Sequence, residues 1–65
     1  MSENITFLRR RQVEARVGLA RATIYQHVKA GTFPAPIRIG VRAVAWVESD
    51  VEAWQAARVS ATRQP

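Results

Sequence analysis

Residues 18–31 read GLARATIYQHVKAG, a segment in which two glycines enclose the pattern of a short amphipathic helix. Ile24 and Val28 are four positions apart, so their side chains lie on one face of such a helix. Gly31 is of the residue type that most often follows the last turn, because glycine adopts the left-handed backbone conformation without strain. The pattern predicts a helix over residues 21–30 that buries one face.

A shorter helix is predicted immediately before it. Residues 10–17 place Val13 and Val17 four positions apart, and Gly18 again provides a stop. Leu19 lies in the link between the two helices, where it can fill the space between them. Two short helices joined by a tight, glycine-containing link form a helix-turn-helix.

The segment after this pair is predicted to be extended and then to form a β-hairpin. Residues 32–36, TFPAP, contain two prolines that forbid further helix, and Phe33 is available to pack beneath the helices. Residues 37–47, IRIGVRAVAWV, alternate apolar and other side chains on both sides of a tip near residues 40–43. Because a lone hairpin is marginal in water, one apolar face is expected on the helices, formed by Ile37, Ile39, Val44 and Trp46.

A third helix is predicted to begin after Ser49. Ser49 and Glu52 have the spacing of a capping box, in which the two side chains bind free amides at the start of a helix. The helix is expected to end near Val59 and to pack through one stripe, formed by Val51, Trp54 and the stem of Arg58.

Together these elements predict one small domain, since a chain of 65 residues can bury only a small core. The predicted fold class is mainly α with a small β-hairpin wing, a winged helix-turn-helix over residues 7–59. Residues 1–6 and 60–65 are polar and are predicted to be flexible tails.

The composition excludes several classes of site. The chain has no cysteine and one histidine, which rules out a disulfide framework and a Cys/His zinc site. No apolar run approaches the roughly 20 residues of a membrane-spanning helix, and a cytoplasmic, nucleoid-associated location is predicted. The sequence shows no paired-carboxylate cleft, activated nucleophile or glycine-rich phosphate loop, so we expect neither enzymatic activity nor a cofactor.

Positive charge is concentrated in the first two thirds of the chain. The net charge is +5 at pH 7, and residues 9–42 carry eight basic side chains against one acid, Glu14. The acids Glu48, Asp50 and Glu52 cluster in the last third. A basic segment of this kind is typical of nucleic-acid-binding proteins.

The outward face of the predicted helix 21–30 suits a DNA groove. The helix carries no acid, and its outward and flanking side chains are Arg21, Ala22, Thr23, Tyr25, Gln26 and Lys29. Glutamine pairs with adenine edges, arginine with guanine, and small apolar groups meet the thymine methyl. A merely solvated face is the alternative, but such faces usually interleave Glu and Lys. We therefore predict that this helix reads bases in the major groove.

Basic side chains outside this helix are candidates for phosphate contacts. Arg9, Arg10 and Arg11 either clamp the DNA backbone or form a flexible basic arm without a fixed partner. Arg42, at the hairpin tip, is predicted to enter an adjacent minor groove or to touch phosphate, with Arg38 on the same surface.

The remaining ring side chains are interpreted mainly as structural. Trp46 and Trp54 are expected to anchor the core rather than to stack on bases. Tyr25 is expected to lie half-buried against the first helix with its hydroxyl free for a phosphate. His27 is expected to pack, or to lie near a phosphate, rather than to act as a catalytic base.

Four short motifs carry a resemblance to a known family: G-L-x-R-x-T-I-Y from residue 18, G-x-F-P-x-P from residue 31, G-x-R-A-V-A-W from residue 40 and E-S-D-V-E-A-W from residue 48. With them, residues 7–59 resemble the AlpA family of small prophage regulators, which are similar to excisionases and to the DNA-binding domains of MerR-type proteins. The resemblance implies a winged helix-turn-helix, of bacterial or phage origin, that binds double-stranded DNA near a promoter or attachment site of an integrated mobile element.

The resemblance also implies roles for single residues. Arg21, Thr23, Tyr25 and Gln26 match the recognition helix, and Arg42 matches the wing-tip arginine. The sequence departs from the family pattern at two positions. Ala20 replaces a common Ser that caps the second helix, and Val17 replaces a common Thr. Loss of such a serine cap costs about 1 kcal/mol.

These observations favour a sequence-specific DNA-binding regulator of an integrated mobile element, acting on transcription, excision or both. The alternative is a protein-interaction adaptor that contacts polymerase or a recombinase through the basic face. Because one copy reads only a few base pairs, cooperative self-association on DNA is predicted. Integrase and RNA polymerase are the candidate protein partners.

Overall fold

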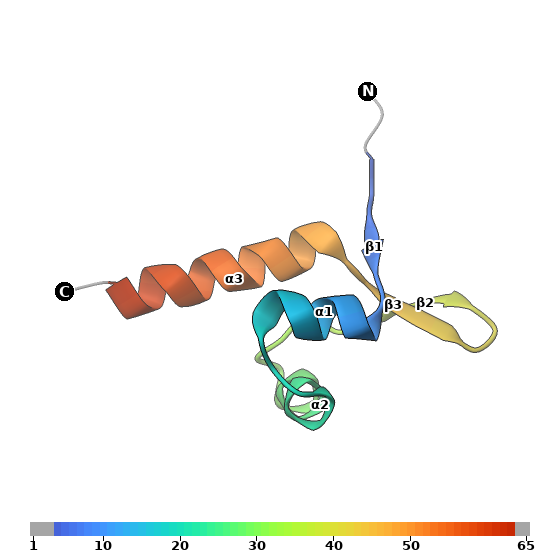
Figure 1. Ribbon diagram of the computed structural model, residues 1–65, viewed down its shortest axis with the longest axis horizontal. Coiled ribbons are helices and arrows are strands. Elements are labelled where there is room, and N and C mark those ends of the chain that lie inside the picture. Colours follow the sequence, from blue (N-terminus) through green and yellow to red (C-terminus); the bar gives the residue numbers. More distant parts are fainter. Residues whose placement is uncertain (1–3, 64–65) are drawn as a thin grey trace.

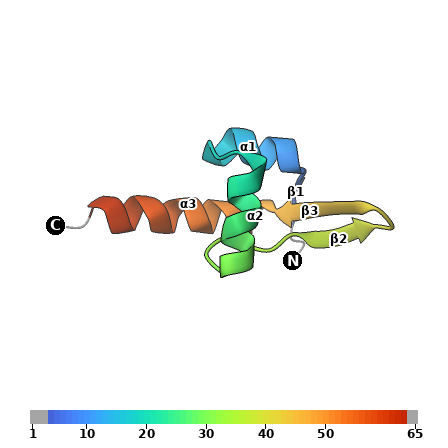
Figure 2. The same cartoon turned by 90° about the horizontal axis from the view of Figure 1, so that it is seen from below.

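The computed structural model describes residues 4–63 and contains three helices and three short strands (Figure 1). In chain order these are β1 (Phe7–Leu8), α1 (Arg10–Val17), α2 (Arg21–Ala30), β2 (Ile37–Gly40), β3 (Ala43–Val47) and α3 (Glu48–Arg63). The β2–β3 hairpin and the far end of α3 extend in opposite directions, with α1 and α2 between them (Figures 1 and 2). The predicted class, mainly helical with a β wing, is confirmed. Over this described part of the chain, none of the helices combines the length and apolarity needed to cross a bilayer.

The predicted helix-turn-helix is confirmed, and both helices have the predicted bounds. Gly18 and Gly31 terminate them with positive φ angles of 73° and 81°, a conformation that L-residues with a side chain rarely adopt. Figure 2 shows α2 crossing in front of the other elements, with one long side free of them.

The sheet has a third strand that the sequence reasoning missed. β1 pairs antiparallel with β3, placing Phe7 opposite Val47 and Leu8 opposite Trp46, and the strand order is β1-β3-β2. The Glu48 amide also donates to the Thr6 carbonyl oxygen at 2.8 Å. A strand of two residues is too short to show alternation, so no sequence pattern indicated it.

The hairpin forms as predicted, but its expected apolar face is wrong. Ile37 pairs with Ala45 and Arg38 with Val44, and an irregularity follows between Arg38 and Gly40. Residues directly opposite each other share a face, so Ile37 points away from the face that carries Val44 and Trp46. A one-residue difference in register moves a whole set of side chains to the other face. Ile37 and Ile39 are 41% and 40% exposed, and Val44, on the face that carries Trp46, is 39% exposed.

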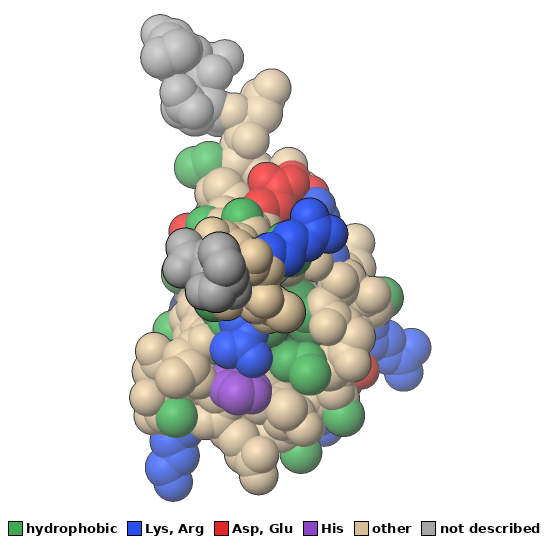
Figure 3. All heavy atoms as spheres, turned by 90° about the vertical axis from the view of Figure 1, so that its left-hand side faces the viewer, with side chains coloured by type: hydrophobic (Ala, Val, Ile, Leu, Met, Phe, Trp, Pro, Cys, Tyr) green, Lys and Arg blue, Asp and Glu red, His purple; other side chains and the backbone are tan. Residues whose placement is uncertain are grey.

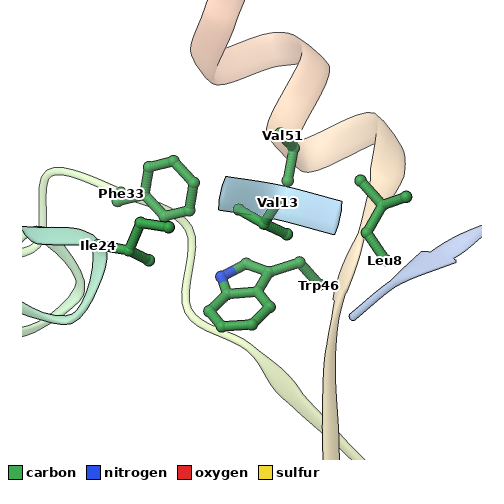
Figure 4. Packing of buried hydrophobic residues seen from close by; sticks show 6 residues of the cluster. All are labelled: Leu8, Val13, Ile24, Phe33, Trp46 and Val51. Carbon is green, nitrogen blue, oxygen red and sulfur yellow. The ribbon is translucent and has the colours of Figure 1, made fainter. Parts of the chain in front are cut away.

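The hydrophobic core forms where α1, α2, β3 and α3 meet (Figure 4). Its fully buried members are Val13, Ile24, Trp46 and Val51, and Leu8 and Phe33 complete it. The Trp46 indole donates from Nε1 to the Pro34 carbonyl oxygen at 2.8 Å, so its one polar atom is satisfied. The prediction that Trp46 anchors the core is confirmed, as is the packing of Leu19 and Phe33 against it.

The prediction for α3 is partly wrong. The helix begins at Glu48, directly after β3, and continues to Arg63 rather than ending near Val59. Ser49 therefore lies inside the first turn. Ser49 is thus not at the cap position of the expected capping box, and Glu52 accepts a hydrogen bond from Arg16. Of the predicted tails, residues 1–3 and 64–65 lie outside the described residues, whereas residues 60–63 continue α3.

The predicted packing stripe of α3 is present in its first half. Val51 is fully buried and Trp54 is half-buried against the core. The Trp54 ring meets Phe33 edge-on at 4.8 Å, and its indole donates to the Thr32 carbonyl oxygen at 2.7 Å. Arg58 is exposed, and its guanidinium lies 5.5 Å from the ring centre of Trp54, one turn earlier on the same helix.

Candidate nucleic-acid interface

The free side of α2 carries most of the side chains predicted to face DNA. Ile24 is fully buried, which orients the helix. Thr23 is half-buried, and the exposed members of the set are Arg21, Ala22, Tyr25, Gln26 and Lys29. Because the helix contains no acid, this side presents donors and cations without an opposing carboxylate of its own.

A basic hollow lies beside this helix. It has a volume of about 320 Å³ and is lined by Arg9, Arg10, Arg11, Tyr25, Arg42 and Val44. These residues come from the start of α1, the middle of α2 and the β2–β3 hairpin. The fold therefore brings together the arginine run, Tyr25 and the hairpin-tip arginine. From the sequence, each of these was a separate candidate for a DNA contact. We refer to it below as the arginine hollow.

The three arginines at the start of α1 differ in their surroundings. The run is part of an ordered helix start rather than a free arm, since α1 begins at Arg10. The Arg9 amide donates to Gln12 Oε1 at 2.8 Å, which holds the first turn. Arg10 forms an ion pair with Glu14, one turn along the helix. Neither Arg9 nor Arg11 is paired with an acid among residues 4–63.

The hairpin arginines occupy different positions. Arg42 lies at the tip between the strands and lines the arginine hollow. Arg38 pairs with Val44 and so lies on the same sheet face, but it does not line the hollow. Both are exposed, and neither has an acidic partner in the described part of the chain.

Comparison with known proteins shows the family to which this chain belongs. The sequence model described as "Prophage CP4-57 regulatory protein (AlpA)" matches residues 6–59, which include the helix-turn-helix, the hairpin and most of α3. The chain belongs to the AlpA family.

Two curated proteins are similar to this chain. "Uncharacterized protein ORF88" of Enterobacteria phage P4 is 40% identical over 89% of this chain, which spans 66% of the phage protein. "DNA-binding transcriptional activator AlpA" of Escherichia coli strain K12 is 33% identical over 83% of this chain and 86% of that protein.

Within this AlpA-family fold, Tyr25 has a ring partner that the sequence did not indicate. It is 37% exposed, and its ring lies 6.0 Å from that of Trp46 in β3, tilted by 58°. Sequence periodicity could not reveal this contact, because it depends on how β3 docks against α2. Tyr25 also lines the arginine hollow beside the start of α1, the helix against which we expected it to lie.

His27 has a structural partner in this AlpA-family chain. Its Nδ1 lies 2.8 Å from Thr32 Oγ1, and the Thr32 amide donates to the His27 carbonyl oxygen at 2.8 Å. These bonds close the C-terminal end of α2 around Gly31. The surroundings of His27 thus fit the packing role predicted for it.

The start of α2 is the weak point predicted for this AlpA-family chain. Ala20 occupies the cap position with an extended backbone, φ −74° and ψ 161°, and no side chain caps the helix. The first turn of α2 also lacks an acid. Its free amides are therefore available to an anion, since helix N-termini favour negative charge.

Arg16 belongs to the basic half of the AlpA-family sequence but not to this interface. Its guanidinium bonds Glu48 Oε2 at 2.6 Å and Glu52 Oε2 at 3.0 Å, and Gln55 Nε2 donates to the Arg16 carbonyl oxygen at 3.0 Å. The hydrogen bond to Glu48 and the charges of both carboxylates raise the pKa of Arg16 above its usual value. Figure 3 shows acidic and basic side chains adjoining on the face seen from the end of α3. Sequence reasoning missed this link between α1 and α3.

A second hollow is unsuited to phosphate. It measures about 460 Å³ and is lined by residues 31–34 together with Asp50, Ala53 and Trp54. Its walls are largely apolar and its charged lining side chain is a carboxylate, which repels anions.

Proposed function

We propose that this AlpA-family protein is a sequence-specific DNA-binding regulator of an integrated mobile element, with α2 in the major groove. The observation that carries the proposal is the arginine hollow directly beside the exposed side of α2. A helix that enters a groove must be flanked by groups that hold the DNA backbone on each side. The hollow supplies such groups from elements that flank α2.

The hollow has the chemistry of a phosphate site. Its arginines offer planar donors that match phosphate oxygens, and Tyr25 adds a hydroxyl. The hairpin tip carries Arg42 next to Val41, which is 88% exposed. Such a tip can follow the backbone or enter the adjacent minor groove.

Base reading and phosphate binding are divided among the side chains of α2. Gln26 and Arg21 are exposed and can form paired hydrogen bonds to base edges. Lys29 lies near the end of the helix as a flexible point charge, which suits phosphate better than a base. Gln26 and Arg21 thus supply sequence preference, and Lys29 supplies affinity common to all sequences.

The biological site is a promoter or attachment site of the mobile element, where binding controls transcription, excision or both. The relative from Escherichia coli is named a DNA-binding transcriptional activator, which supports the regulatory part of this proposal. One α2 helix covers only a few base pairs, so two or more copies bind together at such a site. Integrase and RNA polymerase remain the candidate protein partners.

Selection from a random duplex library tests the proposal. The purified chain is expected to enrich a defined sequence, and the enriched duplex is expected to resist unrelated competitor DNA in an electrophoretic mobility shift. A Gln26→Ala variant is expected to weaken binding to the enriched duplex more than to unrelated DNA. Failure to enrich any sequence, with competitor displacing all bound DNA, would favour the adaptor function and contradict this proposal.

A further inference from the structure

One side of α3 carries an acid and a base that have no ionic partner within the described chain. Asp50, Trp54 and Arg58 are spaced four residues apart, so they lie along one side of the helix. The other acids among residues 4–63 are each paired with an arginine, whereas Asp50 forms no ion pair there, and neither does Arg58. The two charges are separated by eight residues, or about 12 Å of helix, which is too far for them to pair with each other.

This side of α3 is open to a partner. Asp50 and Arg58 are exposed, as are Ala57 and Ala61 beside them, and Trp54 is half-buried. Figures 1 and 2 both show α3 extending past α1 and α2, so none of the other described elements covers its second half. The two alanines are small enough to let another helix approach closely. These five residues form a surface that we call the α3 stripe.

The hollow at the start of the α3 stripe suits a cationic side chain with an apolar stem. This second hollow measures about 460 Å³ and is lined by Asp50, Ala53 and Trp54 together with residues 31–34. It also adjoins the C-terminal end of α2, which carries partial negative charge. Its apolar walls match the stem of an arginine, and the carboxylate and the helix end match the guanidinium. No cation of the described chain lines it.

We propose that two copies of the chain pair through the α3 stripe, with their α3 helices antiparallel. Trp54 is midway between Asp50 and Arg58, so a two-fold axis beside it places Asp50 of each copy opposite Arg58 of the other. Each Arg58 side chain then enters the second hollow of the other copy, and two ion pairs form at once. A two-fold contact uses the same patch on both copies. Parallel helices would instead place like charges opposite each other, so the charges select the antiparallel arrangement.

A second copy fits this surface better than DNA or an unrelated basic protein. A phosphate backbone would be repelled by the carboxylate of Asp50. A basic protein could pair with Asp50 but would leave Arg58 without an acid, whereas a second copy supplies both counter-charges at the required spacing. None of the side chains assigned to DNA belongs to the α3 stripe or to the second hollow. Pairing through α3 therefore does not use them.

The pair is expected to be weak in the absence of DNA. The contact involves one side of a single helix and the hollow beside it. Each copy also carries a net charge of +5, so two copies repel each other until phosphates offset that charge. Association should therefore be strengthened on DNA as cooperative binding. This last step rests on the proposed function, whereas the contact between α3 helices does not.

Charge-swap variants test the contact without DNA. Analytical ultracentrifugation up to about 1 mM protein is expected to show wild-type dimers in the upper part of this range. Arg58→Asp is expected to weaken the dimer at least about tenfold, because it places carboxylate opposite carboxylate. Arg63→Asp is the matched control, since it makes the same charge change on another side of α3. It is expected to dimerise as well as the wild type or better, because it lowers the repulsion between copies.

Mixing two variants separates the contact from an effect on folding. Asp50→Arg alone is expected to lose the dimer, because it places guanidinium opposite guanidinium. An equal mixture of Asp50→Arg and Arg58→Asp is expected to regain it, since each mixed pair again has an acid opposite a base at both positions.

Several outcomes would overturn the proposal. These are a wild-type chain that stays monomeric up to about 1 mM, a dimer unchanged by Arg58→Asp or weakened equally by Arg63→Asp, and a mixture that forms no dimer although both variants keep the wild-type circular dichroism. If Asp50→Arg does not fold, Asp50→Asn takes its place and is expected to weaken the dimer several-fold, and an unchanged dimer would contradict the contact. Because no measurement contains DNA, failure of the proposed function and failure of this contact are separate results.

Discussion

The substitution Arg42→Gln tests whether the hairpin tip contacts the DNA backbone. Arg42 is exposed, lines the arginine hollow and has no acidic partner among residues 4–63. Replacing it by Gln removes one positive charge while keeping a polar side chain of similar length. If Arg42 neutralises one phosphate, the variant releases one counterion fewer when it binds, and its salt dependence becomes shallower.

The structure sets the size of this effect. Two basic residues of the 9–42 segment are engaged by acids, Arg10 by Glu14 and Arg16 by α3. The cations left for DNA are Arg9, Arg11, Arg21, Lys29, Arg38 and Arg42. Arg21 is assigned to base edges, but its charge also displaces counterions when it enters the groove. With about six cations displacing counterions, log affinity falls with log salt at a slope of about −5.4, and with about five the slope is about −4.5. Raising salt from about 50 to 200 mM then weakens wild-type binding roughly 2,000-fold and Arg42→Gln binding roughly 500-fold.

Fluorescence anisotropy of a labelled, selected duplex at a series of salt concentrations measures both slopes. Arg63→Gln is the matched control, because it makes the same charge change at the end of α3, away from the hollow. Its slope is expected to equal that of the wild type. An unchanged slope for Arg42→Gln, or an equal decrease for both variants, would refute the assignment of Arg42 to the DNA backbone.

Three further predictions concern the stability and the specificity of α2. Ala20→Ser adds a side-chain cap and is expected to stabilise the fold by about 1 kcal/mol, which raises Tm by roughly 4–8 °C. Ala20→Val, which adds no hydrogen-bonding group, is expected to give no gain in the same thermal melts. Ile24→Ala is expected to lower the free energy of unfolding by about 2–5 kcal/mol in urea titrations, whereas Gln26→Ala should change it by less than about 0.5 kcal/mol. Gln26→Ala is expected to reduce discrimination between the selected duplex and unrelated DNA by about 1–3 kcal/mol, and Lys29→Ala should weaken both to the same extent. Equal losses of discrimination for these two variants would contradict the division between base reading and phosphate binding.

Features that depend on neighbouring residues were predictable from the sequence. The bounds of α1 and α2 follow from a four-residue apolar spacing and from the glycines that end each helix. The burial of Ile24 and the missing cap at Ala20 follow from the same short segment. Each of these depends on backbone preferences and spacings within one or two turns, which a sequence displays directly.

Features that depend on distant partners were missed or wrong. The register of β2 against β3 includes a local irregularity between Arg38 and Gly40, and it places Ile37 on the face opposite to that of Val44 and Trp46. The pairing of β1 involves only two residues, which show no pattern of their own. Glu52 was assigned to a helix cap, but a guanidinium brought near by the packing of α1 against α3 binds it instead.

The candidate interface likewise combines features that the sequence predicts with features that only the fold produces. The residue types and charges of the interface were predictable from the sequence. A helix without acids that contains a glutamine and has arginines on its flanks indicates DNA binding from its composition alone. The hollow itself is a tertiary feature, since it forms when the start of α1 and the hairpin tip meet beside Tyr25. Folding also removes Arg16 from the DNA-facing set by pairing it with Glu48, 32 positions away. Local spacing specifies which elements form and which face each buries, whereas the positions of charges in space depend on contacts that local spacing does not encode.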